Sequence, residues 1–278
     1  MGNYGSLFRK EISDNAIVPL IGIYDAFSAT LVKNYFNSIF CSGYGFSASR
    51  YGLPDEGFIA WQDMVSYVEN LRSILPEMNI IVDIDDGYGD DKIAREVVHR
   101  LENVGASAVI LEDQRRPKKC GHLPGKDIIE RADYLRRLDA VLNTRNDLFV
   151  IARTDSTEIE EAISRVNDFH NAGADAILVE GLGSYESVKY VRNNIPKEAL
   201  LVVNLIAGGK MGPVSLDKLE ECGVNLVVYS TPCLFAAHEA IKDTMENLKE
   251  SNGILPSKES NISLAESNQV LTENLKKY

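Results

Sequence analysis

Carboxylates collect where two apolar segments of the chain end. The run from Asn79 ends in Asp83 and Asp85, and the run from Ala106 ends in Glu112. Residues two apart on a strand point to the same side, so Asp83 and Asp85 should face one way and Asp86 the other. Oxygen ligands of this kind suit a small, hard cation that keeps part of its water. The spacing predicts a Mg2+ site, with a structural ion-pair cluster as the simpler alternative.

The segment after Glu112 combines a thiol with cationic side chains. It reads Arg115-Arg116-Pro117-Lys118-Lys119-Cys120-Gly121-His122, and five of these eight residues are cationic or can become so. Nearby cations make a thiol more acidic and can hold a substrate carboxylate beside it. We therefore expect Cys120 to take part in chemistry. The other three cysteines, Cys41, Cys222 and Cys233, are expected to be reduced thiols that fill space.

Four further apolar runs also end in chemically useful residues. They end in Ser42-Gly43-Tyr44, in Arg153, in Glu180 and in Asn204. Any one of these could be a helix cap or a solvated strand end. Active sites of parallel barrels form at the carboxyl ends of the strands. Recurrence at the same point of successive units therefore predicts one shared active site.

The segments that must position these residues alternate between short apolar runs and longer runs of helical period, which is typical of repeated βα units. Eight apolar runs can be counted, and the number favours a closed (β/α)8 TIM-type barrel of the α/β class. We predict a catalytic barrel over residues 1–250 and a C-terminal tail or accessory helix over 251–278. The runs begin at Ile17, Ser38, Asn79, Ala106, Leu148, Ala174, Ala199 and Asn225.

The composition disfavours several classes of partner. The chain has 278 residues, 45% of them hydrophobic, which is enough for one full barrel core. Lys and Arg total 29 against 41 Asp and Glu, a net charge of -12, which disfavours binding to nucleic acid or to an anionic membrane. No apolar stretch has the length of a signal peptide core or a membrane span. We expect a cytoplasmic protein.

Four segments together resemble the isocitrate lyase/phosphoenolpyruvate mutase superfamily. They are SGYGFSASRYGLPDEG, DIDDGYGD, EDQRRPKKCGH and IARTDS, and their order and spacing match over roughly residues 15–245. The resemblance implies a (β/α)8 barrel, usually a homotetramer whose subunits exchange a C-terminal helix. It also implies Mg2+, or Mn2+ in its place, at the strand ends. In that superfamily Asp85 would bind the ion directly, while Asp55, Asp83 and Glu112 would steady its waters.

The resemblance further assigns residues to the substrate. Ser42, Gly43 and Tyr44 would bind a substrate carboxylate, and Arg153 would clamp the oxo-acid end. Branches that cleave carbon-carbon bonds keep the cysteine matching Cys120, which protonates the leaving carbanion. Further members of the predicted site are Lys119 and His122, pairing with the carboxylate that gains charge, and Gly121 and Asn204, contacting substrate.

The intact loop favours a Mg2+-dependent carbon-carbon lyase of the short methylisocitrate or alkylmalate type. Its substrate would be a 2-hydroxy di- or tricarboxylate that releases a 2-oxo acid. The base that removes the hydroxyl proton stays open between Tyr44, Glu180 and a metal-held water relayed through Asp83 or Glu112. Ala207 and Met211 depart from the Glu and Thr of the short lyases. A phosphonomutase or phosphonate-forming enzyme using the same enolate is the alternative, and a non-catalytic barrel is a third.

Overall fold

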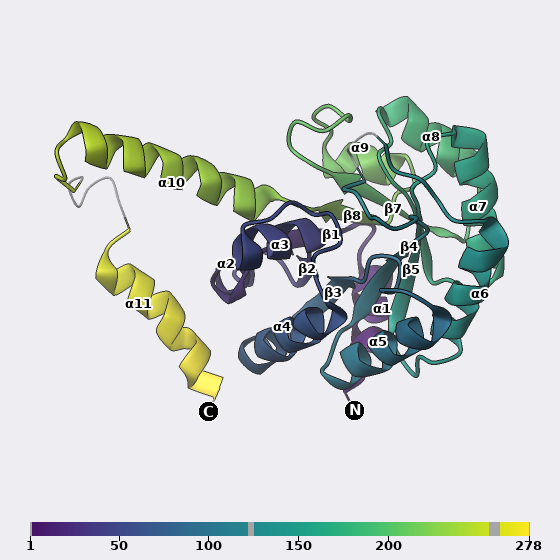
Figure 1. The fold of residues 1–278 in the computed structure, drawn as a ribbon, viewed down its shortest axis with the longest axis horizontal. Helices are drawn as coiled ribbons and strands as arrows, with labels where there is room; N and C mark the ends of the chain where they lie inside the picture. The colour runs from purple at the N-terminus through teal and green to yellow at the C-terminus, as the bar shows by residue number, and fades with distance from the viewer. Residues whose placement is uncertain (1, 122–124, 256–261, 278) are drawn as a thin grey trace.

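The structure is a computed structural model that describes residues 2–121, 125–255 and 262–277. Eight parallel strands close into a barrel in chain order, with β8 beside β1, as Figure 1 shows. The predicted (β/α)8 barrel is therefore confirmed, and each of the eight apolar runs contains one strand. The strands are β1 (Val18–Ile23), β2 (Ser38–Cys41), β3 (Asn79–Asp83), β4 (Ala108–Glu112), β5 (Phe149–Thr154), β6 (Ala176–Val179), β7 (Leu200–Leu205) and β8 (Leu226–Tyr229).

Helices connect the strands and form the outer layer of the barrel (Figure 1). Asp90 caps α5 (Asp91–Asn103), because its side chain accepts from the backbone N–H groups of Lys92 and Ile93. Gly105 follows that helix with a φ of +93°, which favours glycine. The helices are α1 (Tyr4–Asp14), α2 (Ala26–Val32), α3 (Gly43–Tyr51), α4 (Trp61–Ile74), α5 (Asp91–Asn103), α6 (Arg131–Leu142), α7 (Ile159–Asn171), α8 (Tyr185–Asn193), α9 (Leu216–Glu221), α10 (Pro232–Glu250), α11 (Leu264–Glu273) and the 3-10 turn η1 (Asn274–Lys277).

The barrel interior is filled by side chains that alternate along each strand. Odd and even strands contribute successive layers, as expected for this fold. Phe8 of α1 packs with the same interior cluster. The uppermost apolar layer comes from the even strands and consists of Phe40, Ile110, Leu178 and Val228. The layer below comes from the odd strands and consists of Leu20, Ile81, Ile151 and Val202.

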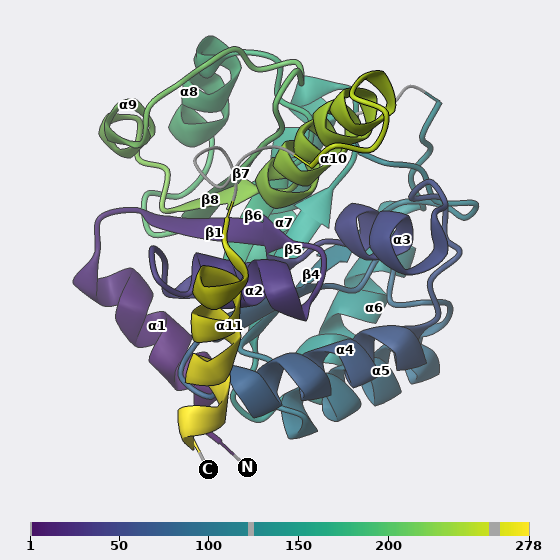
Figure 2. The same ribbon diagram turned by 90° about the vertical axis from the view of Figure 1, so that its left-hand side faces the viewer.

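The C-terminal part departs from a simple barrel. Helix α10 projects away from the strands as an arm (Figure 1), and none of its 19 residues is buried. Helix α11 passes across α2 (Figure 2), where Asn274 donates to Thr30 at 2.9 Å and accepts from Lys33 at 2.7 Å. Among the helices of the described ranges, none is both long and apolar enough to cross a membrane.

Candidate active site

The side chains that follow the apolar layers by two residues along the strands form a further layer, and this layer is mostly polar. Two residues beyond the odd-strand layer come Gly22, Asp83, Arg153 and Asn204. Two residues beyond the even-strand layer come Ser42, Glu112, Glu180 and Ser230. Six of these eight residues line one cavity whose floor is the uppermost apolar layer. The candidate active site is therefore the polar layer directly above the apolar layers that fill the barrel.

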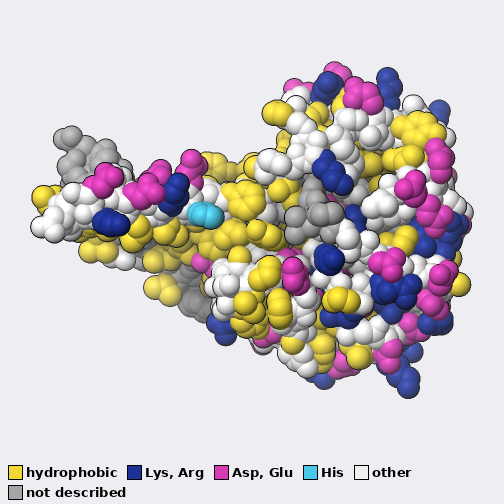
Figure 3. Space-filling view, turned by 45° about the horizontal axis from the view of Figure 1, so that its top comes forward, with side chains coloured by type: hydrophobic (Ala, Val, Ile, Leu, Met, Phe, Trp, Pro, Cys, Tyr) yellow, Lys and Arg dark blue, Asp and Glu magenta, His cyan; other side chains and the backbone are white. Residues whose placement is uncertain are grey.

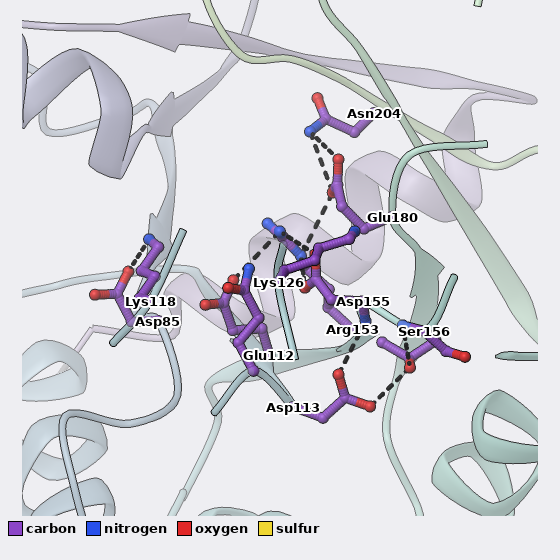
Figure 4. Close-up of polar contacts among 12 residues, drawn as sticks. Asp85, Glu112, Asp113, Lys118, Lys126, Arg153, Asp155, Ser156, Glu180 and Asn204 are labelled. Carbon is purple, nitrogen blue, oxygen red and sulfur yellow. Dashed lines mark hydrogen bonds and ion pairs between the residues drawn. The ribbon is translucent and has the colours of Figure 1, made fainter. Parts of the chain in front are cut away.

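Arg153 is the centre of this polar layer, as Figure 4 shows. Its guanidinium binds Asp155 with both Nε and Nη2, at 2.8 and 2.9 Å. The same group lies 3.3 Å from Glu112 and 3.4 Å from Glu180. Burial would lower the pKa of Arg153, but these three carboxylates hold it well above its ordinary value. A permanent positive charge therefore stands between two of the predicted catalytic strand ends.

A second chain of contacts continues from Glu180 around the mouth of the barrel. The amide nitrogen of Asn204 donates to the two carboxylate oxygens of Glu180, at 3.0 and 3.2 Å. The amide oxygen of Asn204 accepts from the hydroxyl of Ser230 at 2.7 Å. The predicted residues Arg153, Glu180 and Asn204 therefore lie in one hydrogen-bonded series, and Ser230 extends it.

The aspartates of the predicted metal site converge on Lys118. Its ammonium lies 3.2 Å from Asp55 and 3.8 Å from Asp83, and it forms a close ion pair with Asp85 (Figure 4). Burial raises the pKa of Asp85 to about 6, against the opposing charge of Lys118. Asp83 and Asp55 add to that rise in pKa.

One expectation about this segment is wrong. Strand β3 ends at Asp83, so Asp83 and Asp85 do not share a pleated strand. Asp85 has a φ of +49° and begins a turn whose Gly87 has a φ of +83°. A non-glycine residue held in this region is strained, and such strain concentrates at functional sites. The turn still brings both carboxylates to Lys118, while the Asp86 carboxylate pairs with Arg116 at 2.6 Å.

The surroundings of the Glu112 carboxylate indicate whether the site fits a divalent cation. Both of its carboxylate oxygens are buried and accept no hydrogen bond from any described residue. Burial raises the pKa of Glu112 well above its ordinary value, although Arg153 and Lys118 oppose the shift. A buried carboxylate without donors is costly unless a cation or proton compensates it. The oxygen-only donor set with an under-satisfied member fits Mg2+.

The carboxylates do not form a ready-made metal cage. Within the part of the chain that the structure describes, no three acidic, histidine or cysteine side chains are grouped closely enough to hold an ion. The ammonium of Lys118, whose side chain is 3% exposed, lies among Asp55, Asp83 and Asp85. Burial lowers the pKa of Lys118, but these carboxylates raise it well above its ordinary value. Lys118 and a divalent cation would therefore compete for the same oxygens.

The cysteine loop closes the cavity from above. Cys120 and Gly121 line it, and a β-carbon on Gly121 would lie 2.3 Å from Arg153 and 2.5 Å from Glu180. Only glycine fits so close an approach. Lys119 is held by Gln114, which exchanges two hydrogen bonds with its backbone at 2.9 and 3.0 Å, and its ammonium points toward Gly125 rather than into the cavity. The prediction for His122 lies outside the described residues.

The remaining predicted residues lie at the start of α3. Ser42 caps that helix by accepting from Gly45 at 3.3 Å, and Gly43 donates its backbone N–H to Asp83 at 3.4 Å. Tyr44 lines the cavity and packs edge-on against Phe235 of α10, with ring centroids 6.3 Å apart. The backbone donors of a helix start suit a carboxylate ligand.

The cavity itself is small, about 30 Å³ in this structure. That volume holds about one water molecule, far less than a dicarboxylate. Of the predicted residues, Asp85, Glu112, Gly43 and Lys119 do not line it. Ser230 and Asp155 were not among the residues predicted for the site, and Lys118 was predicted only as part of the cationic segment. The first two follow the two-residue period beyond Val228 and Arg153, so that period could have found them.

A profile of the family described as phosphoenolpyruvate phosphomutase matches residues 8–249. The chain is 33% identical to 2-methylisocitrate lyase of Halalkalibacterium halodurans, covering 87% of this chain and 81% of that protein. It is 34% identical to the chloroplastic carboxyvinyl-carboxyphosphonate phosphorylmutase of Arabidopsis thaliana, covering 88% and 74%.

A solved structure of 2,3-dimethylmalate lyase superposes with a TM-score of 0.91 at 28% identity, covering 99% of this chain and 94% of that one. Oxaloacetate acetylhydrolase bound to 3,3-difluorooxalacetate superposes with a TM-score of 0.92 at 27% identity, over the same shares. The fold, the strand-end residues and the profile thus agree with the resemblance seen in the sequence. The chain belongs to the phosphoenolpyruvate phosphomutase family.

Proposed function

We propose that the protein is a Mg2+-dependent lyase that cleaves a carbon-carbon bond of a 2-hydroxy di- or tricarboxylate. The observation that carries this proposal is the position of Cys120, which lines the cavity beside the arginine and carboxylates of the strand ends. Relatives named 2-methylisocitrate lyase and 2,3-dimethylmalate lyase share the family and support it. The products would be a 2-oxo acid and a second carboxylic acid.

The metal would be held by Asp85, with Asp83, Glu112 and Asp55 around its waters. When bound, Mg2+ or Mn2+ supplies Lewis-acid stabilisation of the oxygen that becomes a carbonyl. Lys118 then has to leave Asp85, and Asp55 at 3.2 Å is the carboxylate that can keep its ammonium. Binding of the cation and movement of the segment Arg116–Gly121 would therefore be coupled through the side chain of Lys118.

The substrate would lie between the start of α3 and Arg153. One substrate carboxylate would bind at Ser42, Gly43 and Tyr44, where it would replace Phe40 and Asp83 as acceptors of the backbone N–H groups of Ser42 and Gly43. The Arg153 guanidinium would face the oxo-acid end. Asn204 and Gly121 contact the remainder. Because the cavity measures about 30 Å³, the segment Arg116–Gly121 must withdraw for entry and return afterwards. Return excludes water and strengthens every charge contact in the site.

The proton transfers follow from the positions of Glu180 and Cys120. Glu180 is 3% exposed and sits between Arg153 and Asn204, which favours it over the half-buried Tyr44 as the base for the substrate hydroxyl. As that proton leaves, the carbon-carbon bond breaks and its electron pair moves to the carbon beside the second carboxylate. Cys120 donates its proton to that carbon. Lys119 and His122 are the proposed partners of the carboxylate that gains charge.

The test is a screen for release of 2-oxo acid from 2-methylisocitrate, 2,3-dimethylmalate, oxaloacetate and phosphonopyruvate, with and without Mg2+. We expect metal-dependent cleavage of at least one 2-hydroxy acid. Activity confined to phosphonopyruvate or phosphoenolpyruvate would instead support a phosphonate-forming enzyme. The 34% identity with a carboxyvinyl-carboxyphosphonate phosphorylmutase is the observation that keeps this second candidate open.

We also propose that the protein assembles as a homotetramer through the α10 arm. A groove of about 710 Å³ lies between α2 and the base of α10, where Phe27, Leu31 and Tyr35 line it. Figure 3 shows hydrophobic side chains gathered along one side of the arm and over its base, and Ile241 and Met245 are 61% and 53% exposed. The arm of a second copy has the length and apolar side chains to cover such a groove.

The assembly is tested by light scattering on the intact chain, on a chain ending at Asn252 and on the double variant Ile241→Ser, Met245→Ser. We expect the intact chain to be tetrameric and the double variant to dissociate. The chain ending at Asn252 should lose stability and assembly together. A double variant that stays tetrameric and equally stable would show that the arm does not mediate the assembly.

A further inference from the structure

We propose that Ser230 is a positioning residue that orients Glu180 through the side-chain amide of Asn204. The inference rests on the proposed function, in which Glu180 accepts the hydroxyl proton of the substrate. Ser230 follows β8, lines the cavity and is 7% exposed. It is the last member of the polar layer that also contains Ser42, Glu112 and Glu180.

The direction of each hydrogen bond in the series is fixed by chemistry. An ionised carboxylate can only accept, so the amide nitrogen of Asn204 must face Glu180. The amide oxygen then faces Ser230, whose hydroxyl donates to it at 2.7 Å. Ser230 therefore supplies the donor that keeps the buried end of the amide satisfied in the orientation that Glu180 requires.

Loss of the Ser230 hydroxyl would loosen Asn204 without breaking a strand. The amide oxygen would have no donor from β8, and the two contacts at 3.0 and 3.2 Å would hold Glu180 less firmly. Arg153, which lies 3.4 Å from the same carboxylate, would then draw Glu180 toward the centre of the site. Hydrogen bonds in series strengthen one another, so the effect of Ser230 is expected to reach beyond its own contact.

The neighbouring Thr231 provides a matched control. It is 2% exposed at the same end of β8, and its hydroxyl has no hydrogen-bond partner among the described residues. Thr231→Val removes that hydroxyl at constant shape. If loss of any buried hydroxyl at this end disturbed the site, Thr231→Val would reproduce the effect of Ser230→Ala.

The experiment compares the steady-state kinetics of Ser230→Ala, Ser230→Thr and Thr231→Val on the acid that the wild-type protein cleaves. Ser230→Ala should lower kcat roughly tenfold, the usual worth of one hydrogen bond, with KM changed less than about twofold. Ser230→Thr keeps the hydroxyl and should restore kcat, and Thr231→Val should match the wild type. The acidic limb of the kcat profile against pH should move in Ser230→Ala alone, because only that variant changes the surroundings of the base.

A double variant shows whether Ser230 acts through Asn204. In an Asn204→Leu background, adding Ser230→Ala should change kcat less than about twofold, because coupled residues are not additive. Full additivity, or wild-type kcat and pH profile in Ser230→Ala, would overturn the inference while leaving the lyase proposal intact. A wild-type protein that cleaves none of the acids overturns the lyase proposal itself, and the role of Ser230 with it.

Discussion

Two buried glutamates ten residues apart, Glu102 and Glu112, stand at opposite ends of the barrel and have opposite surroundings. Glu102, in α5, is 7% exposed and accepts the backbone N–H groups of Asn146, Asp147 and Leu148. Glu112, at the end of β4, is 1% exposed and accepts no hydrogen bond from a described residue. Both side chains are largely withdrawn from solvent, Glu112 more deeply than Glu102, and the supply of hydrogen-bond donors also differs.

The difference appears in the acidity of the two groups. Burial alone would raise the pKa of Glu102, but the three backbone donors outweigh it and hold that pKa below its ordinary value. At Glu112 burial prevails and the pKa is raised well above the ordinary value. A buried carboxylate whose oxygens accept a full set of hydrogen bonds stabilises the fold. A buried carboxylate that lacks hydrogen-bond donors can instead bind a cation, a proton or a substrate. Glu102 at the base of the barrel therefore stabilises the fold, whereas Glu112 lies at the end of the barrel where we propose the chemistry.

The largest expected effect comes from the mouth. Asp85→Asn should abolish turnover, because the amide removes the charge of the proposed direct Mg2+ ligand, while the circular dichroism spectrum should stay native. Calorimetric titration should show loss of Mg2+ binding. Asp86→Asn is the matched control, since Asp86 lies in the same turn but faces Arg116 and Arg137. Wild-type activity in Asp85→Asn, or full activity in excess chelator, would remove the metal from the mechanism.

The second prediction concerns the thiol of the loop. Cys120→Ser keeps the size of the side chain but is far less acidic, so turnover should fall by roughly two to four orders of magnitude, the usual worth of a positioned proton donor. Mg2+ binding should change little. Cys233→Ser, at the base of α10 and outside the site, serves as the control. Near-native turnover of Cys120→Ser on the true substrate would end the lyase assignment in favour of the phosphonomutase.

The periodicity of the sequence predicted most of the residues at the carboxyl ends of the strands, but not the contacts among their side chains. Eight apolar runs and their polar ends predicted the barrel and brought Arg153, Glu180 and Asn204 together, because successive parallel strands end on one side. Ser230 was missed because its contact is with Asn204 of another strand, which the run from Asn225 does not reveal by itself. The direction of the Lys118 side chain was not predicted, because the backbone of a loop has no regular period. The sequence also does not distinguish Lys118 from its neighbour Lys119.

The third prediction concerns Glu102, at the base of the barrel, which should affect stability but not turnover. Glu102→Gln places an amide nitrogen against backbone donors, so one or more buried N–H groups should lose their acceptor. We expect a loss of about 3 kcal/mol in the free energy of unfolding, the cost of a buried charged acceptor, with unchanged kcat in the protein that remains folded. Glu96→Gln lies on the same helix with an exposed partner and should change stability by less than about 0.5 kcal/mol. A kcat that fell in proportion to stability would contradict the division between base and mouth.

The smallest effect, and the one specific to electrostatics, is the pH dependence of stability at the two ends. Burial raises the pKa of Asp113, next to Glu112, to about 6 from an ordinary 3.8, although Thr154 and the backbone of Asp155 donate to it. Between these values the folded protein holds the proton more tightly than the unfolded chain. The contribution of Asp113 to stability therefore falls as the pH rises from about 4 to 6, on the order of 2 kcal/mol.

Glu102 behaves in the opposite way, because its lowered pKa gives stability that is present above the ordinary glutamate pKa and is lost as the pH falls. Urea unfolding of the wild type, Asp113→Asn and Glu102→Gln across pH 3.5 to 7 separates the two contributions. Relative to the wild type, Asp113→Asn should gain stability as the pH rises toward 6, and Glu102→Gln should gain it as the pH falls below about 4.5. Only these slopes are compared, so any constant offset from lost hydrogen bonds cancels. Slopes of the same sign for both variants would contradict the opposite pKa shifts of Asp113 and Glu102.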